Sequence, residues 1–201
     1  FAIALDQGLI GKIFIFYWGS YCNYKFDYDL TISDAQKIIE VLILDDVYAV
    51  WDIQGCHRQF KELLKVLPKK SKVICVGDLV NRGPDSLGTL RTLKRLQEEG
   101  RAECILGNHD LHLLARDAGI RGPKSLDTLD DVLNAPDRKE LIDWLRYRPM
   151  VLYSGKKNYD TLFVHAGILP QWDVSQTLEL ADELQKKGLV IPLKGLCLGL
   201  M

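Results

Sequence analysis

The chain has 201 residues, of which 47% are hydrophobic and 26% are charged, a balance typical of a single globular domain with a substantial core. Its formal net charge of -1 excludes a global basic field for nonspecific nucleic-acid binding, so a small anionic ligand would require a local positive site. The five cysteines are odd in number and contain no CxxC pair, which argues against a disulfide framework or a zinc finger and favours a reducing cytoplasm.

Residues 1–45 are rich in aromatic side chains but carry no motif that can be attached to a chemistry. Residues 33–44 are compatible with a helix, and we treat the whole segment as an N-terminal extension of uncertain origin. Asp6 and Lys12 interrupt its apolar patches, so no run of about 18 apolar residues is available to cross a bilayer. We therefore expect no membrane association.

From Val47 onward, apolar runs alternate with segments of helical periodicity, and we expect one domain over residues 46–188. The predicted strands and helices are, in order, a strand at 47–50, a helix at 57–67, a strand at 73–76, a helix at 86–99, a strand at 103–106 and a helix at 111–117. Two short helices at 125–133 and 137–148, a strand pair at 151–154 and 161–164, and a helix at 175–187 follow, before an apolar tail at 189–201. This order predicts an α/β sandwich with mixed strands.

Four short polar clusters each follow an apolar run, at the point where a predicted strand ends. They are Asp52 and Gln54, the stretch 77–84 with Asp78 and Arg82, then Asn108, His109 and Asp110, and finally His165. Ligand sites in α/β sheets collect at the carboxyl ends of strands, so these side chains converge if the four strands are neighbours. Their oxygens and imidazole suit manganese, magnesium, iron or cobalt better than a thiolate-seeking metal. The predicted metal ligands are Asp52, Gln54, Asp78, Asn108 and His165.

Such a set of ligands predicts hydrolysis of a phosphate compound. Two divalent ions about 3.5 to 4 Å apart can activate a shared water and neutralise phosphoryl oxygens, with Asp78 as the natural bridging carboxylate. Arg82 and Asn108 are the expected substrate contacts, because the planar guanidinium of an arginine grips a pair of phosphate oxygens. His109 is the candidate acid for the leaving oxygen, and Asp110 is expected to orient and charge it.

Each of these residues also has a simpler structural interpretation. A single aspartate after a strand is most often a turn former or a helix cap. His112 is expected to lie behind the site or on the helix surface, and His57 to be a solvated residue at a helix start. The lysines at positions 69, 70 and 72 are expected to form a solvated turn rather than an RNA contact. The hydrolase hypothesis depends on the joint occurrence of the four clusters, since independent turn formers would not share this range of ligand types.

Together the clusters closely resemble the signature of the calcineurin-like metallophosphoesterases. Residues 77–87, 106–114, 133–137 and 164–173 resemble, more narrowly, the bacterial-type symmetrical diadenosine tetraphosphate hydrolases, also called bis(5'-nucleosyl)-tetraphosphatases, and the resemblance runs from about Val47 to Gln185. The protein serine/threonine phosphatases share the metal motifs. However, they carry aspartate where Asn81 stands and lack the sequence Pro-Gln-Trp-Asp after the fourth motif.

The resemblance implies a sandwich of mixed β-sheets flanked by helices, and cleavage of diadenosine tetraphosphate into two molecules of ADP. It implies Asp52, Asp78, Asn108 and His165 as metal ligands, Arg82 as the phosphate contact and His109 as the acid. Activity on dinucleoside-polyphosphate caps at RNA 5' ends is implied as well.

This chain departs from the family pattern in three places. Gln54 stands where the superfamily has a metal-binding histidine, and an uncharged amide should loosen one metal site. Trp51 replaces the glycine that usually precedes the first aspartate. The last third of the family's sequences, which carries a metal-binding histidine in a Gly-His-Trp element, has no counterpart after Gln185. The alternative hypotheses are therefore a catalytically impaired fragment that binds metal or nucleotide without turnover and, as a weaker match, a protein phosphatase.

Overall fold

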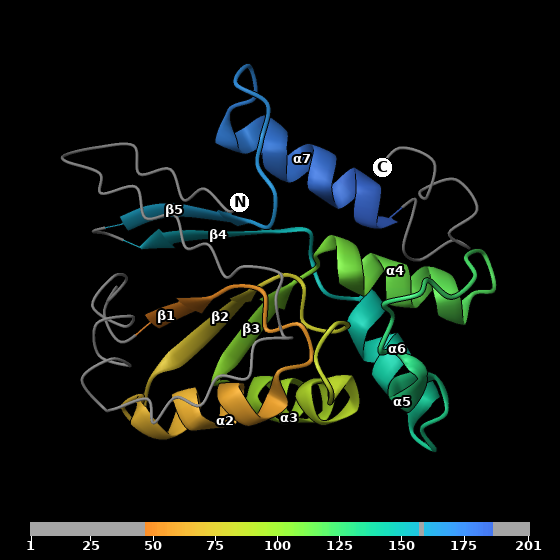
Figure 1. Ribbon diagram of the computed structural model, residues 1–201. Helices are drawn as coiled ribbons and strands as arrows, with labels where there is room; N and C mark the ends of the chain where they lie inside the picture. The colour runs from red at the N-terminus through yellow and green to blue at the C-terminus, as the bar shows by residue number, and fades with distance from the viewer. Residues whose placement is uncertain (1–46, 157–158, 187–201) are drawn as a thin grey trace.

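The first half of the described chain forms a parallel three-stranded sheet. The computed structural model describes residues 47–156 and 159–186, so the extension, its expected helix at 33–44 and the tail at 189–201 lie outside the described residues (Figure 1). Strands β1 (Val47–Val50), β2 (Lys72–Val76) and β3 (Ala102–Ile105) lie in the order β1-β2-β3, connected by helices α2 (His57–Val66) and α3 (Ser86–Glu98). The predicted alternation of strands and helices is confirmed here.

The second half adds helices at one end of this sheet and a separate hairpin. Its elements are α4 (Asn108–Asp117), α5 (Asp130–Leu133), α6 (Arg138–Arg146), β4 (Val151–Lys156), β5 (Tyr159–Val164) and α7 (Val174–Leu184). Strands β4 and β5 pair antiparallel, with Val151 opposite Val164, as the two apolar runs around the glycine-containing turn predict. Within the described residues, none of these helices combines the length and the apolar character that crossing a bilayer requires.

The central strand β2 is buried on both faces, because helices cover one face of the parallel sheet and the hairpin covers the other. Side chains alternate along a strand, so Val73 and Cys75 of β2 pack in the core between the sheet and helices α2 and α3, whereas Ile74 and Val76 pack against Phe163 of β5. Figure 1 shows the resulting order of layers, with α2 and α3 below the parallel sheet, the β4–β5 hairpin above it and α7 above the hairpin. The expected sandwich of mixed sheets is confirmed.

The fourth polar cluster, with His165, lies at the end of a strand that belongs to a different sheet from the strands of the other three clusters. The four strands are not neighbours in one sheet, because β5 belongs to the second, two-stranded sheet. Face-to-face packing of the two sheets nevertheless brings the end of β5 over the ends of β1, β2 and β3 (Figure 1). Convergence therefore depends on the packing between sheets rather than on strand order.

Two local predictions are wrong for reasons that lie outside local sequence. The helix expected at 125–133 is reduced to Asp130–Leu133, because the side chain of Asp127 is turned inward to tertiary partners instead of capping a helix. His57 is not a solvated residue. Its Nδ1 lies 2.6 Å from Asp85 Oδ2, its Nε2 lies 2.8 Å from Thr92 Oγ1, and the side chain is 18% exposed, so it joins the start of α2 to α3.

A candidate metal and phosphate site

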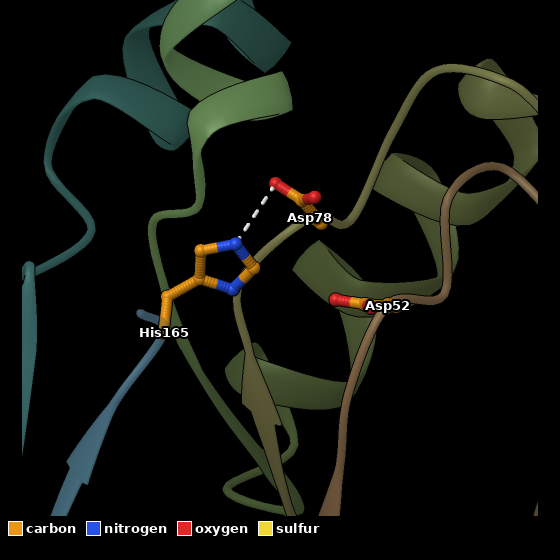
Figure 2. Close-up of side chains that lie close together, drawn as sticks. All are labelled: Asp52, Asp78 and His165. Carbon is orange, nitrogen blue, oxygen red and sulfur yellow. Dashed lines mark ion pairs between the residues drawn. The ribbon is translucent and has the colours of Figure 1, made fainter. Parts of the chain in front are cut away.

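Three side chains from different strand ends converge above the parallel sheet. Asp52 follows β1, Asp78 follows β2 and His165 follows β5, and one ligand atom from each lies within 4.8 Å of the others (Figure 2). Asp78 is the most buried of them, at 4% exposure. Two carboxylates and an imidazole in this arrangement form a donor set for a divalent cation.

The ring of His165 is turned so that its unprotonated nitrogen faces the side-chain oxygens of Asp78 and Asn108. Its Nδ1 lies 2.9 Å from the carbonyl oxygen of Val76, which can only accept, so Nδ1 carries the proton and donates it. Nε2 then keeps its lone pair, and it lies 3.4 Å from Asp78 Oδ1 and 3.3 Å from Asn108 Oδ1. A backbone carbonyl that fixes the tautomer of a histidine in this way is typical of metal-ligating histidines.

The electrostatics of Asp52 fit a bound cation. Burial raises the pKa of the Asp52 carboxyl, and the nearby charge of Asp78 raises it further, while His165 acts in the opposite direction. Each of these two carboxylates disfavours ionisation of the other, and a positive ion between them would stabilise the ionised form of both. The residues present therefore fit the divalent ions that the four clusters predict.

The backbone around the donors is strained at several positions. Among the residues that the structure describes, left-handed φ angles occur at five non-glycine residues, all of them in the first two clusters: Asp52, Gln54, Asp78, Asn81 and Arg82. Strain of this kind concentrates at functional sites, where the surrounding structure must hold it. Gln54 supplies part of that support through its backbone, since its N–H donates to the carbonyl of Asp78 (2.8 Å) and its carbonyl accepts from Gly83 (2.7 Å). Gln54 thus connects the first cluster to the second.

Gly77 is required because His165 packs directly against its α-carbon. A Cβ at this position would lie 2.5 Å from His165 Nδ1 and 2.9 Å from the α-carbon of Gly107, and the φ angle is +78°. Any side chain here would push the imidazole off the Val76 carbonyl.

We therefore expect Gly77→Ala to lower the free energy of unfolding by about 3 kcal/mol or more and to weaken divalent-metal binding. Gly100→Ala is the matched control, because Gly100 has a similar φ of +71° but open space around its Cβ position. Its expected cost is the backbone strain alone, about 1 kcal/mol, with metal affinity unchanged. Thermal unfolding and calorimetric titration with Mn²⁺ measure both quantities. Equal effects of the two substitutions would contradict the assigned contact with His165.

The third cluster lies at the start of α4 and borders the same space. Asn108 Oδ1 approaches His165 Nε2, as given above, and the backbone N–H of His109 donates to Asp78 Oδ1 over 2.9 Å. The His109 ring lies with Nε2 3.7 Å from Asp78 Oδ2 and Nδ1 2.9 Å from Asn81 Nδ2. Burial lowers the pKa of His109, and the positive charge of Arg82 and the other nearby histidines lower it further, whereas Asp78 raises it.

Asp110 does not have the place that the sequence suggested. Rather than facing His109, its carboxylate is fully buried and accepts backbone hydrogen bonds from Leu79 (2.9 Å), Val80 (3.3 Å) and Gly107 (2.8 Å). Burial raises the pKa of Asp110 well above its usual value and Asp78 adds to this effect, with the three N–H donors opposing it. Asp110 therefore connects the loop after β2 to the start of α4.

Sequence reasoning missed a second layer of polar residues behind His109. Asn81 contacts Asp127, and Asp127 in turn pairs with His112 (2.8 Å) and with Arg116 (3.0 Å). His112 is 6% exposed, so it lies behind the site and not on the helix surface. In the sequence, Asn81 stands out only as a difference from the protein phosphatases. No local signal in residues 119–129 marks Asp127, because its partners lie on α4 and in the second cluster.

Arg82 lies at the rim of the site, held by both backbone and side chain. Its N–H donates to the side-chain oxygen of Asn81 (2.9 Å), and its Nη1 donates to the carbonyl of Leu126 (3.1 Å). One hydrogen bond leaves most donors of the guanidinium available to an anion. Leu126 itself is 67% exposed.

Comparison with known proteins agrees with the chemistry of this site. A family model described as calcineurin-like phosphoesterase matches residues 46–194. The chain is 50% identical over 140 residues to "Bis(5'-nucleosyl)-tetraphosphatase, symmetrical" of Ralstonia nicotianae, which covers 70% of this chain and 48% of the relative. It is 48% identical over 141 residues to the protein of the same name from Janthinobacterium sp., which covers 69% of this chain and 49% of the relative.

A solved structure is similar as well. "Crystal structure of a putative diadenosine tetraphosphatase" aligns with a TM-score of 0.51 at 33% identity, over 65% of this chain and 54% of that one. The chain spans about half the length of the curated relatives it matches, at 48% and 49% of the two above.

Proposed function

We propose that this chain, which belongs to the calcineurin-like phosphoesterase family, is the metal-dependent part of a hydrolase that cleaves diadenosine tetraphosphate symmetrically into two molecules of ADP. The observation that carries the proposal is the convergence of Asp52, Asp78 and His165 within 4.8 Å at the ends of strands from two sheets. The similar proteins named symmetrical bis(5'-nucleosyl)-tetraphosphatases support the choice of substrate.

We propose two divalent ions, manganese, cobalt, magnesium or iron, as cofactors. Asp52, Asp78 and His165 would hold them, with Asn108 as a further oxygen donor beside His165. The amide oxygen of Gln54, two residues after Asp52 in the sequence, is the proposed fifth ligand. When bound, such ions lower the pKa of a water molecule and neutralise phosphoryl oxygens. Asp78 is the proposed bridging ligand, because it is the most buried of the three donors and interacts with both His165 and His109.

The remaining residues would act on the substrate itself. Arg82 would bind phosphate oxygens with the guanidinium donors that its bond to Leu126 leaves available, which supplies the local positive charge that the whole chain lacks. His109 would face the leaving oxygen with Nε2, the ring atom on the side of Asp78. Asp110 would act at a distance, by fixing the loop that carries Asp78.

Product analysis tests the symmetry of cleavage. With Mn²⁺ or Co²⁺ present, we expect diadenosine tetraphosphate to yield ADP as the only nucleotide product, followed by chromatography over time. ATP plus AMP in equal amounts would contradict symmetrical cleavage. Capped RNA 5' ends share the bridging polyphosphate, and in a parallel assay they show whether the second substrate class implied by the family resemblance is used.

Two alternative functions can be tested on the same purified protein. A fragment that binds metal or nucleotide without turnover would give heat on calorimetric titration but no ADP. A protein phosphatase would release phosphate from a phosphopeptide, and Asn81, which stands in place of the aspartate of those enzymes, argues against it. The proposed cytoplasmic location follows from the cysteine pattern of the sequence.

A further inference from the structure

The side-chain amide of Asn81 has partners that fix which of its ends is oxygen and which is nitrogen. Two backbone N–H groups point at one end, from Arg82 (2.9 Å) and from Thr128 (3.0 Å), so this end must be the accepting oxygen. A carboxylate oxygen of Asp127 lies 3.2 Å from the other end, which must therefore be the donating nitrogen. Asn81 is 1% exposed, so water does not compete for these positions.

The same nitrogen lies 2.9 Å from Nδ1 of His109. Since an amide nitrogen has only hydrogens to offer, Nδ1 must be the acceptor and cannot carry a proton in this contact. We propose that Asn81 holds His109 in the Nε2–H tautomer, so that its one ring proton lies on the side of Asp78 and the candidate metal ligands. Asn81 is then a positioning residue that acts through His109.

Asp127 secures this arrangement because it stays an acceptor. Burial alone would raise the pKa of Asp127, but hydrogen bonds from the backbone N–H of Lys124, from His112 and from Asn81 outweigh burial and hold it well below its usual value. A protonated Asp127 could donate a hydrogen bond to the side-chain oxygen of Asn81, and the amide of Asn81 could then flip by about 180°. The ionised carboxylate excludes that orientation.

The catalytic consequence rests on the proposed hydrolase function, whereas the tautomer does not. In the Nε2–H tautomer the one ring proton of His109 lies on the side of Asp78, so His109 would stabilise the leaving oxygen as a hydrogen-bond donor through Nε2. An aspartate at position 81, as in the protein phosphatases that the sequence resembles less well, would accept from Nδ1–H and favour the opposite arrangement.

Nitrogen NMR of the histidine rings measures the tautomer directly. The 201-residue chain contains four histidines, so selective ¹⁵N-histidine labelling gives few signals, and the His109→Gln variant identifies those of His109. With diamagnetic Mg²⁺ present, we expect Nδ1 of His109 to resonate as an unprotonated ring nitrogen and Nε2 as a protonated one. A protonated Nδ1 in the unsubstituted chain would overturn the proposal.

An exchange of the two partners provides the matched variant. In Asn81→Asp/Asp127→Asn, the asparagine at 127 can donate to the aspartate at 81 while its oxygen still accepts from the Lys124 N–H, His112 and Arg116. The exchange keeps each of these contacts, reverses the direction of the hydrogen bond between positions 81 and 127, and turns the group that faces His109 Nδ1 from a donor into an acceptor. We expect Nδ1 to become protonated, and the double variant to unfold at a higher temperature than Asn81→Asp alone, which sets two carboxylates against each other. An unprotonated Nδ1 in a folded double variant would overturn the proposal.

Activity separates this inference from the proposed function. At a pH where the spectra show neutral His109 in the exchanged variant, its Nε2 has no proton to donate, so we expect kcat to fall at least about tenfold with KM little changed. Unchanged kcat beside a reversed tautomer would overturn the catalytic part. If the unsubstituted chain releases no ADP, the proposed function fails, and the spectra still decide the tautomer.

Discussion

Asp78→Asn is expected to abolish ADP release from diadenosine tetraphosphate, with a loss of about 10³-fold or more in kcat, above the 10- to 100-fold typical of removing an outer partner of a metal site. The reason is that Asp78 is the buried carboxylate on which His165 and His109 converge, at 3.4 and 3.7 Å. Removing its charge removes the strongest donor of the site. Mn²⁺ titration of the same variant should show a matching loss of affinity.

The Asp78→Asn variant should still fold, so a loss of its activity can be assigned to the site rather than to unfolding. Asparagine has nearly the same shape, and its oxygen can still accept the hydrogen bond that the His109 N–H donates to Asp78 Oδ1. Asp143→Asn on α6 is the control, since this carboxylate is half-exposed and lies 3.6 Å from Arg146 on the same helix. Its activity should equal that of the unsubstituted chain. An Asp78→Asn variant that binds Mn²⁺ with undiminished affinity would remove Asp78 from the ligand set.

The parallel half of the fold could be predicted from the sequence because its signals are local. Residues 73–76 form an uninterrupted apolar run, which a strand buried on both faces requires, and the leucines at 87, 90, 93 and 96 define the inner face of α3. The break of the helix expected at 125–133 had no such signal. Aspartate is a residue type that often caps the N-terminus of a helix, so the sequence alone favours a cap at Asp127. Its side chain instead points inward because it binds His112 and Arg116 of α4.

The candidate site was predictable as a set of residues but not as a set of contacts. Each cluster follows an apolar run, so the placement of Asp52, Asp78 and His165 at strand ends could be inferred from spacing. Which side chain faces which partner depends on packing between sheets and on turn conformation. Asp110 shows this limit, because its position next to His109 in sequence suggested a contact, whereas the start of α4 directs its carboxylate to the backbone of the preceding loop.

That geometry makes Asp110 the residue whose loss should affect stability most among the predicted site residues. Three backbone N–H groups converge on its two oxygens, and all three belong to the turns that carry the second and third clusters. The carboxylate is fully buried, so water cannot replace it when it is removed. Each buried N–H left without a partner costs about 1–3 kcal/mol.

We expect Asp110→Ala to lower the free energy of unfolding by about 4 kcal/mol and the midpoint of thermal unfolding by about 10 °C. Asp110→Asn keeps one accepting oxygen and should lie between Asp110→Ala and the unsubstituted chain. Asp130→Ala is the control, because that carboxylate is 81% exposed and its nearest cation, on Arg116, lies 3.4 Å away. Calorimetric unfolding orders the three variants. If Asp110→Ala unfolds at the temperature of Asp130→Ala, the loop after β2 and the start of α4 are held together by something other than this carboxylate.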